Sequence, residues 1–449
     1  MHLLPQLRET ERRFEHELVV IGVHAGKFHA ERETANIRQA VLRLEIDHPV
    51  VNDRQFRIWR SYGVNAWPTM AFIDPDGHYI GSQAGEVLAS DLVRVIGEMV
   101  SQYDAQGKIN RGPLTLRSEQ SLEPDRPLAF PGKILAATQE RLFISDSNHH
   151  RILAVRLNLE GDHGTVEAVA GRGTPGLADG QLHSAAFYRP QGLALHGDLL
   201  YVADTENHAV RLIDWAKGTV TTVAGTGEQD HYRLNSGGRG PQVALNSPWD
   251  VLVHEGSVYV VMAGSHQLWR LDFASGQIQL HGGTGREALV DGPLLRAALN
   301  QPSGLATDGS RIYFADSEAS AIRWADPGPQ GKLGTIVGTG LFDFGDVDGA
   351  GDAVRLQHPV GLTWHGGKIY VADTYNNKIK VVDPATRSAA TFAGTGDTGH
   401  QDGDVAAFNE PCGLSATENR LYVADTNNHL IRVIDLATRR VSTLALNGA

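Results

Sequence analysis

The chain has 449 residues, of which 41% are hydrophobic and 20% charged, which is enough for two to four domains with separate cores. Its formal net charge of −12 speaks against a nucleic-acid partner, because phosphate binding depends on clustered Lys and Arg. No apolar run reaches the roughly 18 residues of a membrane-spanning helix, so no membrane partner is expected. The single cysteine, Cys412, excludes a disulfide within the chain and favours a reducing, cytoplasmic compartment.

The first 105 residues alternate between helical and strand patterns. Residues 2–16 are amphipathic and predict a helix, and the apolar run at 18–25 predicts a buried strand. Further elements are expected in chain order: helices over 31–45 and 54–61, a hairpin of 69–74 with 78–83, and a helix over 88–103. Residues 106–129 are rich in Gly, Pro and charge and therefore predict a linker.

Short strands separated by Gly and Asp turns fill the chain from residue 130 onward. A repeat runs Pro-x-Gly-Leu, Tyr-Val-Ala-Asp-Thr-x-Asn-His, a Val/Ile-Arg strand and Val-Ala-Gly. Its six copies begin at Pro131, Pro190, Pro248, Pro302, Pro359 and Pro411. Four strands per copy at a period of about 50 residues predict a six-bladed β-propeller over 130–449. How the ring closes is not evident, and residues 113–117 are a candidate for an added strand in the last blade.

This repeat resembles the NHL repeat over nearly all of 130–445. Several segments are similar to the family of NHL-repeat-containing protein two and its bacterial relatives, namely residues 2–5, 21–24, 130–133, 247–250 and 344–349. The order of the two regions strengthens the resemblance. It implies a multidomain protein in which an incomplete α/β thioredoxin-like domain (1–105) precedes an all-β propeller.

The resemblance also implies what the first domain lacks. Trp67-Pro68-Thr69 matches the element that carries a cis-proline in thioredoxin-like proteins, so Pro68 is expected to be cis. A strand and a Cys-x-x-Cys motif would precede Met1, and that strand would lie between the strands at 18–25 and 67–73. We therefore expect a damaged sheet, with thiol–disulfide activity possible only in a longer form. The alternative is a naturally inactive thioredoxin-like fold that acts as a spacer.

Histidines recur at one register of the repeat. They are His150, His208, His266 and His429, with Ser320 and Asn377 in the other two blades. Turns about 10 Å or more from the axis cannot bring ligands within ~2.1 Å of one ion, so a turn motif is predicted in place of a metal site. The acidic loop at 343–352 fails the calcium-loop template and predicts turn chemistry as well. No metal and no cofactor are expected.

The axial channel and the third blade are the remaining places to look for function. The variable residues of Pro-x-Gly are Gly132, Gln191, Trp249, Ser303, Val360 and Cys412, which offer no acid or base, so no catalytic residue is assigned. The third copy has Met262 where the other copies have the turn Asp. Its unusual residues form the candidate partner-binding set: Trp249, Asp250, Met262, His266 and Trp269. Simple drift of the repeat is the alternative.

The sequence thus predicts a propeller scaffold that binds a protein partner and is fused to a thioredoxin-like domain. The alternative is a metal-dependent propeller hydrolase or lyase, to which the similar NHL-type amidating lyases point. RNA binding, as in some NHL propellers, conflicts with the acidic charge and the lack of a basic patch.

Overall fold

The computed structural model describes residues 3–112, 119–230 and 237–449. The chain divides into two compact units, Met1–Asp125 and Arg126–Ala449. The boundary falls inside the segment 106–129 that the composition predicted as a linker. No helix in the described residues is both long and apolar enough to cross a membrane.

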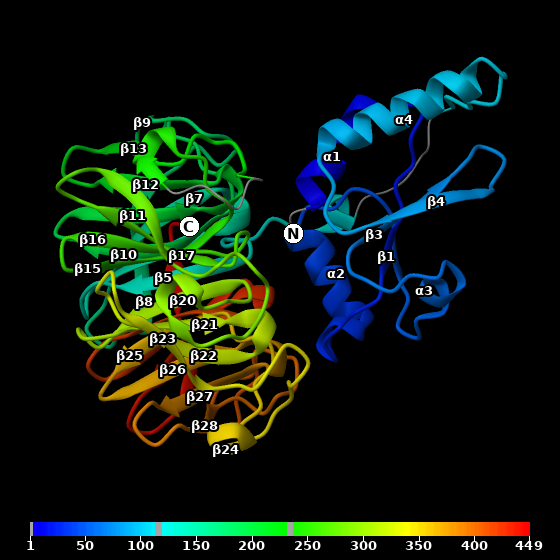
Figure 1. Cartoon of the computed structure of the whole chain (residues 1–449). Helices are drawn as coiled ribbons and strands as arrows, with labels where there is room; N and C mark the ends of the chain where they lie inside the picture. The colour runs from blue at the N-terminus through cyan, green and yellow to red at the C-terminus, as the bar shows by residue number, and fades with distance from the viewer. Residues whose placement is uncertain (1–2, 113–118, 231–236) are drawn as a thin grey trace. The chain divides into compact units, whose positions relative to one another are not determined.

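The first unit consists, in its described part, of four α-helices around two separate two-stranded sheets (Figure 1). Strand β1 pairs in parallel with β2, and β3 pairs antiparallel with β4. The elements are α1 (Leu3–Arg13), β1 (Gly22–His24), η1 (Ala30–Arg32), α2 (Thr34–Arg43), β2 (Val50–Asn52), α3 (Arg57–Ser61), β3 (Thr69–Ile73), β4 (Tyr79–Ala84), α4 (Ala89–Asp104) and η2 (Glu119–Leu122).

Helical spacing of apolar residues explains α4, the longest helix of the described part of this unit. Helix α4 buries Ala89, Leu92 and Ile96 on one face, as the period of 3.6 residues requires. The chain after α4 stays with the first unit, because Arg111 pairs with both Asp104 (2.7 Å) and Glu17 (2.8 Å).

The second unit is a six-bladed propeller, in which each blade contains four antiparallel strands (Figure 1). In five blades the inner strand begins at the repeat proline, and in blade 5 it begins two residues later, at Gly361. Blade 1 contains β5 (Pro131–Ala136), β6 (Arg141–Asp146), β7 (Arg151–Leu157) and β8 (His163–Ala170). Blade 2 contains β10 (Pro190–His196), β11 (Leu199–Asp204), β12 (Ala209–Asp214) and β13 (Thr219–Ala224). Blade 3 contains β15 (Pro248–His254), β16 (Ser257–Met262), β17 (Gln267–Asp272) and β18 (Gln277–Gly282).

The remaining blades repeat this order of four strands. Blade 4 contains β20 (Pro302–Thr307), β21 (Ile312–Asp316), β22 (Ala321–Ala325) and β23 (Lys332–Val337). Blade 5 contains β25 (Gly361–His365), β26 (Lys368–Asp373), β27 (Lys378–Asp383) and β28 (Ser388–Ala393). Blade 6 contains β29 (Pro411–Ala416), β30 (Arg420–Asp425), β31 (Leu430–Asp435) and β32 (Val441–Thr443).

Short 3-10 turns join the second and third strands of five blades, and others lie in the loops between blades. The first group is η3 (Ser147–His149), η4 (Thr205–Asn207), η7 (Ser317–Ala319), η9 (Thr374–Asn376) and η10 (Thr426–Asn428). The second group is η5 (Gly240–Gln242), η6 (Leu294–Arg296) and η8 (Gly351–Ala353). The turn motif predicted from Asp-x-x-Asn-His is therefore a 3-10 turn followed by one left-handed residue.

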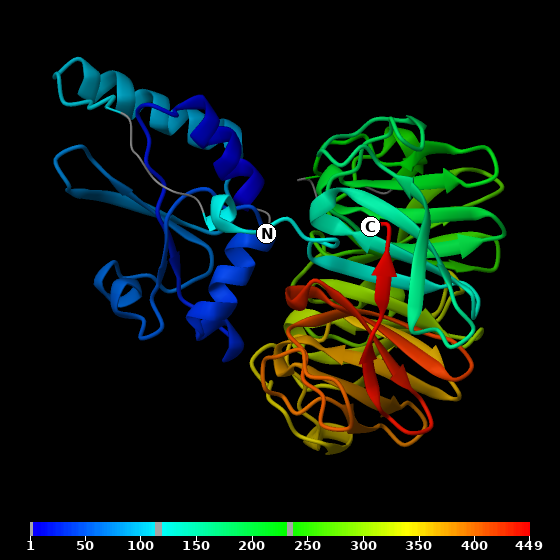
Figure 2. The same cartoon turned by 180° about the vertical axis from the view of Figure 1, so that it is seen from behind.

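A short outer strand closes the outside of most blades. The loops that lead into blades 2 to 5 supply it, as β9 (Gly180–Gln181), β14 (Gly237–Arg239), β19 (Gly292–Pro293) and β24 (Gly349–Ala350). In blade 1 the C-terminal strand β33 (Ala445–Asn447) takes this place and pairs in parallel with β8 (Figure 2). The ring is therefore closed by the C-terminus on the first blade. Residues 113–117, the candidate for an added strand, lie outside the described residues.

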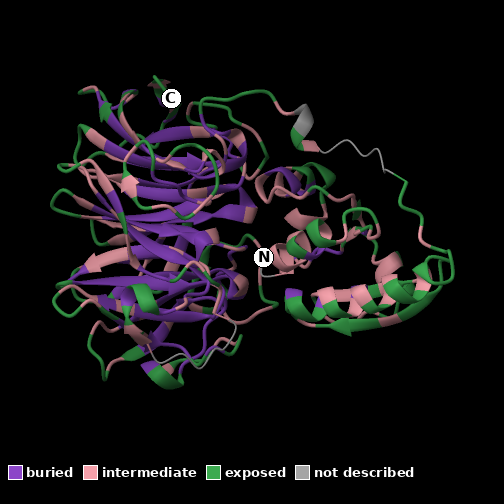
Figure 3. Cartoon of the chain, turned by 90° about the horizontal axis from the view of Figure 1, so that it is seen from above, coloured by how far each residue is buried: buried purple, intermediate pink, exposed green. Residues whose placement is uncertain are grey.

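The propeller core lies between the blades. Six clusters of buried apolar side chains fill the six interfaces between neighbouring blades. Figure 3 shows this as continuous buried colouring through the propeller strands. Each blade is thus stabilised by both of its neighbours, which makes completion of the ring important for every interface.

Candidate functional site

The inner strands approach one another closely at the propeller axis. A Cβ placed on Gly361 would lie 1.8 Å from the carbonyl oxygen of Cys412, and one on Gly304 would lie 2.5 Å from that of Val360. The glycine two residues after the repeat proline is therefore required by backbone crowding. Its absence in a blade needs a specific explanation.

Two blades lack this glycine, and their residues pair with each other across the axis. Lys133 of blade 1 donates to Asp250 of blade 3 (Nζ–Oδ2 3.3 Å) and to the carbonyl oxygens of Ser303 (3.0 Å) and Val360 (3.3 Å). Asp250 also accepts from the backbone N–H of Leu305 (2.9 Å). Both side chains are buried, and this burial raises the pKa of Asp250, opposed by the neighbouring Lys133.

This ion pair fills the part of the axis at which the repeat suggested a channel site. It uses the only carboxylate that the sequence placed there, Asp250, so that carboxylate is already bound to a cation and to backbone N–H groups. The departure from the repeat pointed to Asp250, whereas Lys133 was not predicted to lie at the axis. A signal was present, because the two residues that replace glycine at this register carry opposite charges.

The candidate partner-binding set does not form one surface. Met262 and Trp269 are buried in the apolar cluster between blades 2 and 3, where the indole Nε1 of Trp269 donates to Gln267 (3.0 Å). Asp250 lies at the axis and His266 is buried in the turn after β16. Only Trp249 keeps a partly exposed side chain. A role for these residues in partner binding stays a prediction.

Blade 3 differs because a buried ion pair is replaced by apolar groups. In blade 2, Arg211 pairs with Asp204 of the turn (2.8 Å), and both side chains are fully buried. Trp269 and Met262 occupy the corresponding registers of blade 3. Replacement of a buried ion pair by well-packed apolar side chains is often neutral or stabilising. Packing alone therefore explains Met262 and Trp269, without a binding partner.

The repeated histidines link each blade to the next. The left-handed residue after each turn accepts a hydrogen bond from the backbone N–H of the residue before the next repeat proline, and we call this contact a seam bond. Four seam bonds use a histidine Nδ1: Phe130 to His429 (3.1 Å), Arg189 to His150 (3.2 Å), Ser247 to His208 (3.1 Å) and Gln301 to His266 (3.1 Å). The others are His358 to Ser320 (3.2 Å) and Glu410 to Asn377 (2.9 Å).

The acidic loops also serve the fold. Asp291 accepts from the buried Arg323 (2.9 Å) and from the backbone N–H and hydroxyl of Thr335 (2.9 and 2.8 Å). The same contacts recur at Asp179, Asp348 and Asp402, with Lys380 in place of arginine in blade 5. The turn chemistry predicted for these loops thus has a defined form, in which the loop carboxylate binds the fourth strand of the blade and a buried cation.

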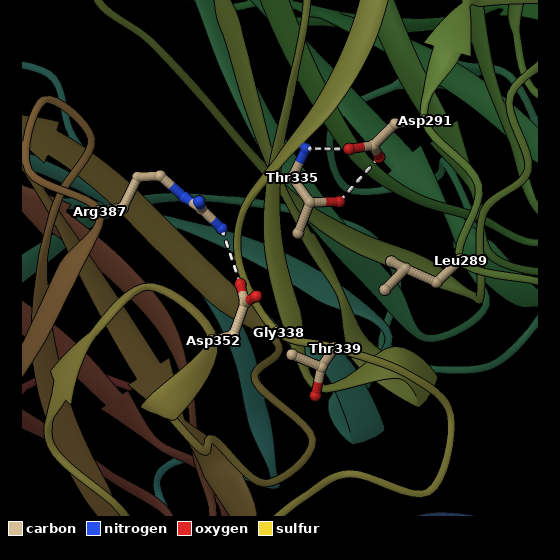
Figure 4. Close-up of a pocket in the computed structure, with 7 residues that line it drawn as sticks. All are labelled: Leu289, Asp291, Thr335, Gly338, Thr339, Asp352 and Arg387. Atoms are coloured by element: carbon tan, nitrogen blue, oxygen red, sulfur yellow. Dashed lines mark hydrogen bonds and ion pairs between the residues drawn. The ribbon is translucent and has the colours of Figure 1, made fainter.

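One cavity of about 670 Å³ opens between blades 4 and 5 (Figure 4). Its polar groups include Asp291 and Thr335, which bind each other, and the exposed ion pair of Asp352 with Arg387 (3.0 Å). Arg387 also donates to the carbonyl of Ile336 (2.9 Å). Of these contacts, the one from Arg387 to Ile336 joins blade 5 to blade 4, and the other two lie within one blade or the loop that leads into it. Their arrangement points to no reaction.

In the first unit the notable surface lies around Pro68. The Trp67–Pro68 peptide bond is cis, and Trp67 is half exposed. Its ring centroid lies 4.6 Å from that of Trp59, and Phe56 packs edge-on against both. The indole Nε1 of Trp67 donates to the carbonyl of Ala25 (2.8 Å), which ties the start of β3 to the end of β1.

A cluster of Asp74, Asp76 and His78 lies at the β3–β4 turn of this unit, with ligand atoms within 4.8 Å of one another. Asp74 accepts from the backbone N–H groups of Asp76 and His78, as in an ordinary Asx turn. Lys108 pairs with Asp76 (2.5 Å). The turn and this lysine account for the cluster.

Comparison with known proteins agrees with this architecture. The NHL repeat family model matches residues 187–211 and 408–434, which take in the first two strands and part or most of the third strand of blades 2 and 6. The chain is 38% identical over 490 residues to NHL repeat-containing protein 2 of Homo sapiens, which covers 99% of the chain. The chain belongs to the family of NHL repeat-containing protein 2.

The relatives are longer proteins than this chain. The protein SUPPRESSOR OF QUENCHING 1, chloroplastic, of Arabidopsis thaliana is 43% identical over 473 residues, covering all of this chain. The chain spans 44% of that protein's length and 66% of the length of the Homo sapiens relative. A solved Bacteroides thetaiotaomicron protein of unknown function shares the fold, with a TM-score of 0.51, 16% identity and coverage of 69% of this chain and 70% of its own.

Proposed function

We propose that this protein is a binding scaffold whose propeller presents a protein-binding face on its inter-blade loops. Among the described residues of the second unit, seven large apolar side chains are exposed, and six of them belong to these loops: Leu177, Val290, Leu295, Phe342, Val347 and Val405. Exposed apolar residues that gather on one kind of loop favour a protein interface over solvent. The occupied axis favours the same conclusion, because it leaves surface loops as the place for function.

The loops lie on the same side of the ring as the turns between second and third strands. Asn207 of one such turn donates to the carbonyl of Gly176 (2.8 Å), and Asn376 donates in the same way to Gly345 (2.7 Å). The opposite side carries the turns between third and fourth strands, where Leu159 is exposed. Leu159 therefore provides a matched control on the other face.

The test compares charged substitutions on the two faces. The tagged protein and the variants Phe342→Glu, Val405→Glu and Leu159→Glu would be cross-linked in cells and the captured proteins quantified by mass spectrometry. We expect the loop variants to lose the same partner at least tenfold and Leu159→Glu to keep it. A partner lost only with Leu159→Glu, or with none of the three, would contradict the proposal.

Metal analysis separates the scaffold from the alternative of a metal-dependent hydrolase or lyase. We expect purified protein to contain zinc and calcium far below one equivalent, since Asp250 is bound to Lys133 and the loop carboxylates to Arg and Thr. One equivalent of either metal that survives dialysis would favour the enzyme. The single cysteine fits a reducing, cytoplasmic location, which cell fractionation would test.

We further propose that the first unit is thioredoxin-like and that one strand fits between β1 and β3. In the described residues each of these strands has a partner on one edge only. Val19, Ile21 and Val23 alternate along the chain into β1 and are all exposed, as is Val51 beside Val23 in β2. Thiol–disulfide activity would then belong to a longer form, because Cys412 of the propeller is the only cysteine here.

Cysteine cross-linking measures the spacing of these strands. Two strand intervals of ~4.8 Å would separate β1 from β3, which is too far for a direct disulfide. In a Cys412→Ser background, Val23→Cys with Ala71→Cys should cross-link only through a spacer of about 10 Å. Val23→Cys with Val51→Cys, which face each other in the β1–β2 register, is the positive control for a direct disulfide. Rapid disulfide formation by the first pair would contradict the proposal.

A further inference from the structure

The interface between blades 6 and 1 differs from the other five, because the chain crosses it only at its C-terminal end, where β32 of blade 6 leads into β33 on blade 1. Every other pair of neighbouring blades is joined by a loop, whereas this interface joins the start of the second unit to its end. We call it the closing seam. Because only this short terminal strand spans it, the closing seam depends on contacts between side chains and backbone more than the other interfaces do.

The segment that leads into the first blade, residues 126–130, is fixed at this seam. Leu128 is buried in the apolar cluster shared by blades 6 and 1. Blade 1 holds the segment through Arg151 to the carbonyl of Pro127 (3.0 Å) and through the Ala129 N–H to Asp146 (2.7 Å). Blade 6 holds it through the seam bond from the Phe130 N–H to His429.

That seam bond requires an uncharged imidazole. Nδ1 of His429 accepts the Phe130 N–H at 3.1 Å, so its lone pair is free and the ring proton lies on Nε2. Nε2 is buried without a hydrogen-bond partner, and the Phe130 ring packs 4.3 Å away edge-on. Protonation would place an N–H on Nδ1 facing the N–H of Phe130, which replaces an attraction by a repulsion.

The surrounding charges do not compensate for a proton on His429. Arg126 of the lead-in segment and His149 of blade 1 oppose it, while Asp146 favours it. Asp146 is already engaged by His149 (2.8 Å) and Arg151 (2.8 Å). On the histidine's own turn, Asp425 is bound to Arg432 (2.8 Å) and to Asn428 (2.8 Å).

We propose that the closing seam is an acid-sensitive latch: protonation of His429 breaks its bond to Phe130 and releases the segment 126–130 from blade 6. Burial, with Arg126 as a smaller contributor, lowers the pKa of His429 to about 4 in the folded protein. The unfolded value is about 6.5, so the native state binds fewer protons between these values. The stability that the latch supplies is present above about pH 6.5 and is lost as the pH falls towards 4.

The chain contains its own controls. The seam bonds to Ser320 and Asn377 use acceptors that do not titrate near neutral pH, in the same place relative to their blades. Asn377 also shows that asparagine adopts the left-handed turn conformation there, with φ of 52° compared with 57° at His429. His429→Asn therefore preserves an acceptor and removes only the titration.

Hydrogen exchange on the full chain tests the latch directly. After correction for intrinsic rates, we expect protection of the Phe130 amide to fall about 20-fold from pH 7 to pH 5, and the Glu410 amide to stay unchanged. His429→Asn should abolish the fall at Phe130. His149→Asn, which introduces the residue that blades 2, 5 and 6 carry at this turn position, should retain it, as should His208→Asn.

Two results would overturn the proposal. One is a Phe130 amide in His429→Asn that loses protection with acid as steeply as in the native sequence. The other needs no variant: an imidazole NMR titration of His429 at or above pH 6.5 without any change at Phe130.

Discussion

At the scale of single residues, the axis shows how crowding and charge act together. Four blades place glycine where neighbouring backbones nearly touch, and the two exceptions, Lys133 and Asp250, meet inside the ring. Their side chains meet at the axis, where a Cβ on the glycine of another blade would collide with the backbone of its neighbour. The ion pair therefore distinguishes blades 1 and 3 from the other four blades, which have glycine at this position.

Loss of one partner of this pair should be more harmful than loss of both. Lys133→Met leaves a buried carboxylate without its cation, for which we expect a decrease of about 3–5 kcal/mol in the free energy of unfolding. The double variant Lys133→Gly/Asp250→Gly restores the residue of the other blades and should lose less. Urea unfolding followed by tryptophan fluorescence measures both, and equal losses would speak against an axial pair.

Blade 5 offers a residue-scale test of pH dependence. Lys380 replaces the arginine of blades 2, 4 and 6 and binds Asp346 and Asp348, while Asp373 of the turn keeps only uncharged donors such as Asn376 (2.7 Å). Burial raises the pKa of Asp373 to about 7, compared with about 6 for Asp204, which has a direct arginine partner.

The sign of the effect follows from this raised value. Because the unfolded pKa is about 3.9, the native state binds more protons between pH 4 and 7, and the contribution of Asp373 to stability falls as the pH rises through that range. We expect Asp373→Asn to flatten the pH dependence of unfolding and Lys380→Arg to raise stability at pH 8. An unchanged slope in Asp373→Asn would show that other groups dominate.

At the scale of the element, blade 3 exchanges a buried ion pair for an apolar contact without loss of strand register. Its β16–β17 ladder runs from Ser257↔Asp272 to Met262↔Gln267, as regular as its counterpart in blade 2. The repeat thus tolerates either solution at these two positions, provided that both change together.

Coupled substitution in blade 3 tests this interpretation. Met262→Asp alone buries an unpaired carboxylate and should decrease the free energy of unfolding by about 3–5 kcal/mol. Adding Trp269→Arg should recover part of that loss, because Arg and Asp pair at these registers in blades 2, 4 and 6. A double-mutant cycle measures the coupling. Additive losses would contradict it.

At the scale of the whole molecule, closure depends on a short parallel pairing. Strand β33 contributes Ala445, Leu446 and Asn447 opposite residues 163–165 of β8, and Leu446 packs on the cluster between blades 6 and 1. This places the C-terminus where blades 2 to 5 carry the loop that leads into them.

Removal of β33 should therefore weaken one particular interface. Deletion of residues 445–449 should lower the melting temperature by several degrees and speed amide exchange at residues 163–165, because β8 then loses its outer partner. Deletion of residues 448–449 alone is the control and should leave both unchanged. Equal exchange at 163–165 in the two deletions would mean that β33 does not close the ring.

The sequence by itself determined the number of blades, the position of every inner strand and the turn motif. These depend on local patterns: Pro-x-Gly for close backbone approach and Asp-x-x-Asn-His for a turn that ends left-handed. The helices of the first unit, β1 and the β3–β4 hairpin were likewise predicted to within a few residues, because apolar spacing is a local property. Strand β2 was not predicted, and the strand expected to be buried at 18–25 exposes Val19, Ile21 and Val23.

Only the tertiary structure decided which distant residues meet. Lys133 and Asp250 are 117 positions apart, and His429 and Phe130 are 299 apart. No pattern along the chain reports such distances, because they arise when six similar units bend into a ring and their equivalent positions converge. The same closure buried Met262 and Trp269, two residues whose departure from the repeat had suggested an exposed site. The repeat determines the strands and turns of each blade, and closure of the ring determines which residues of different blades are in contact.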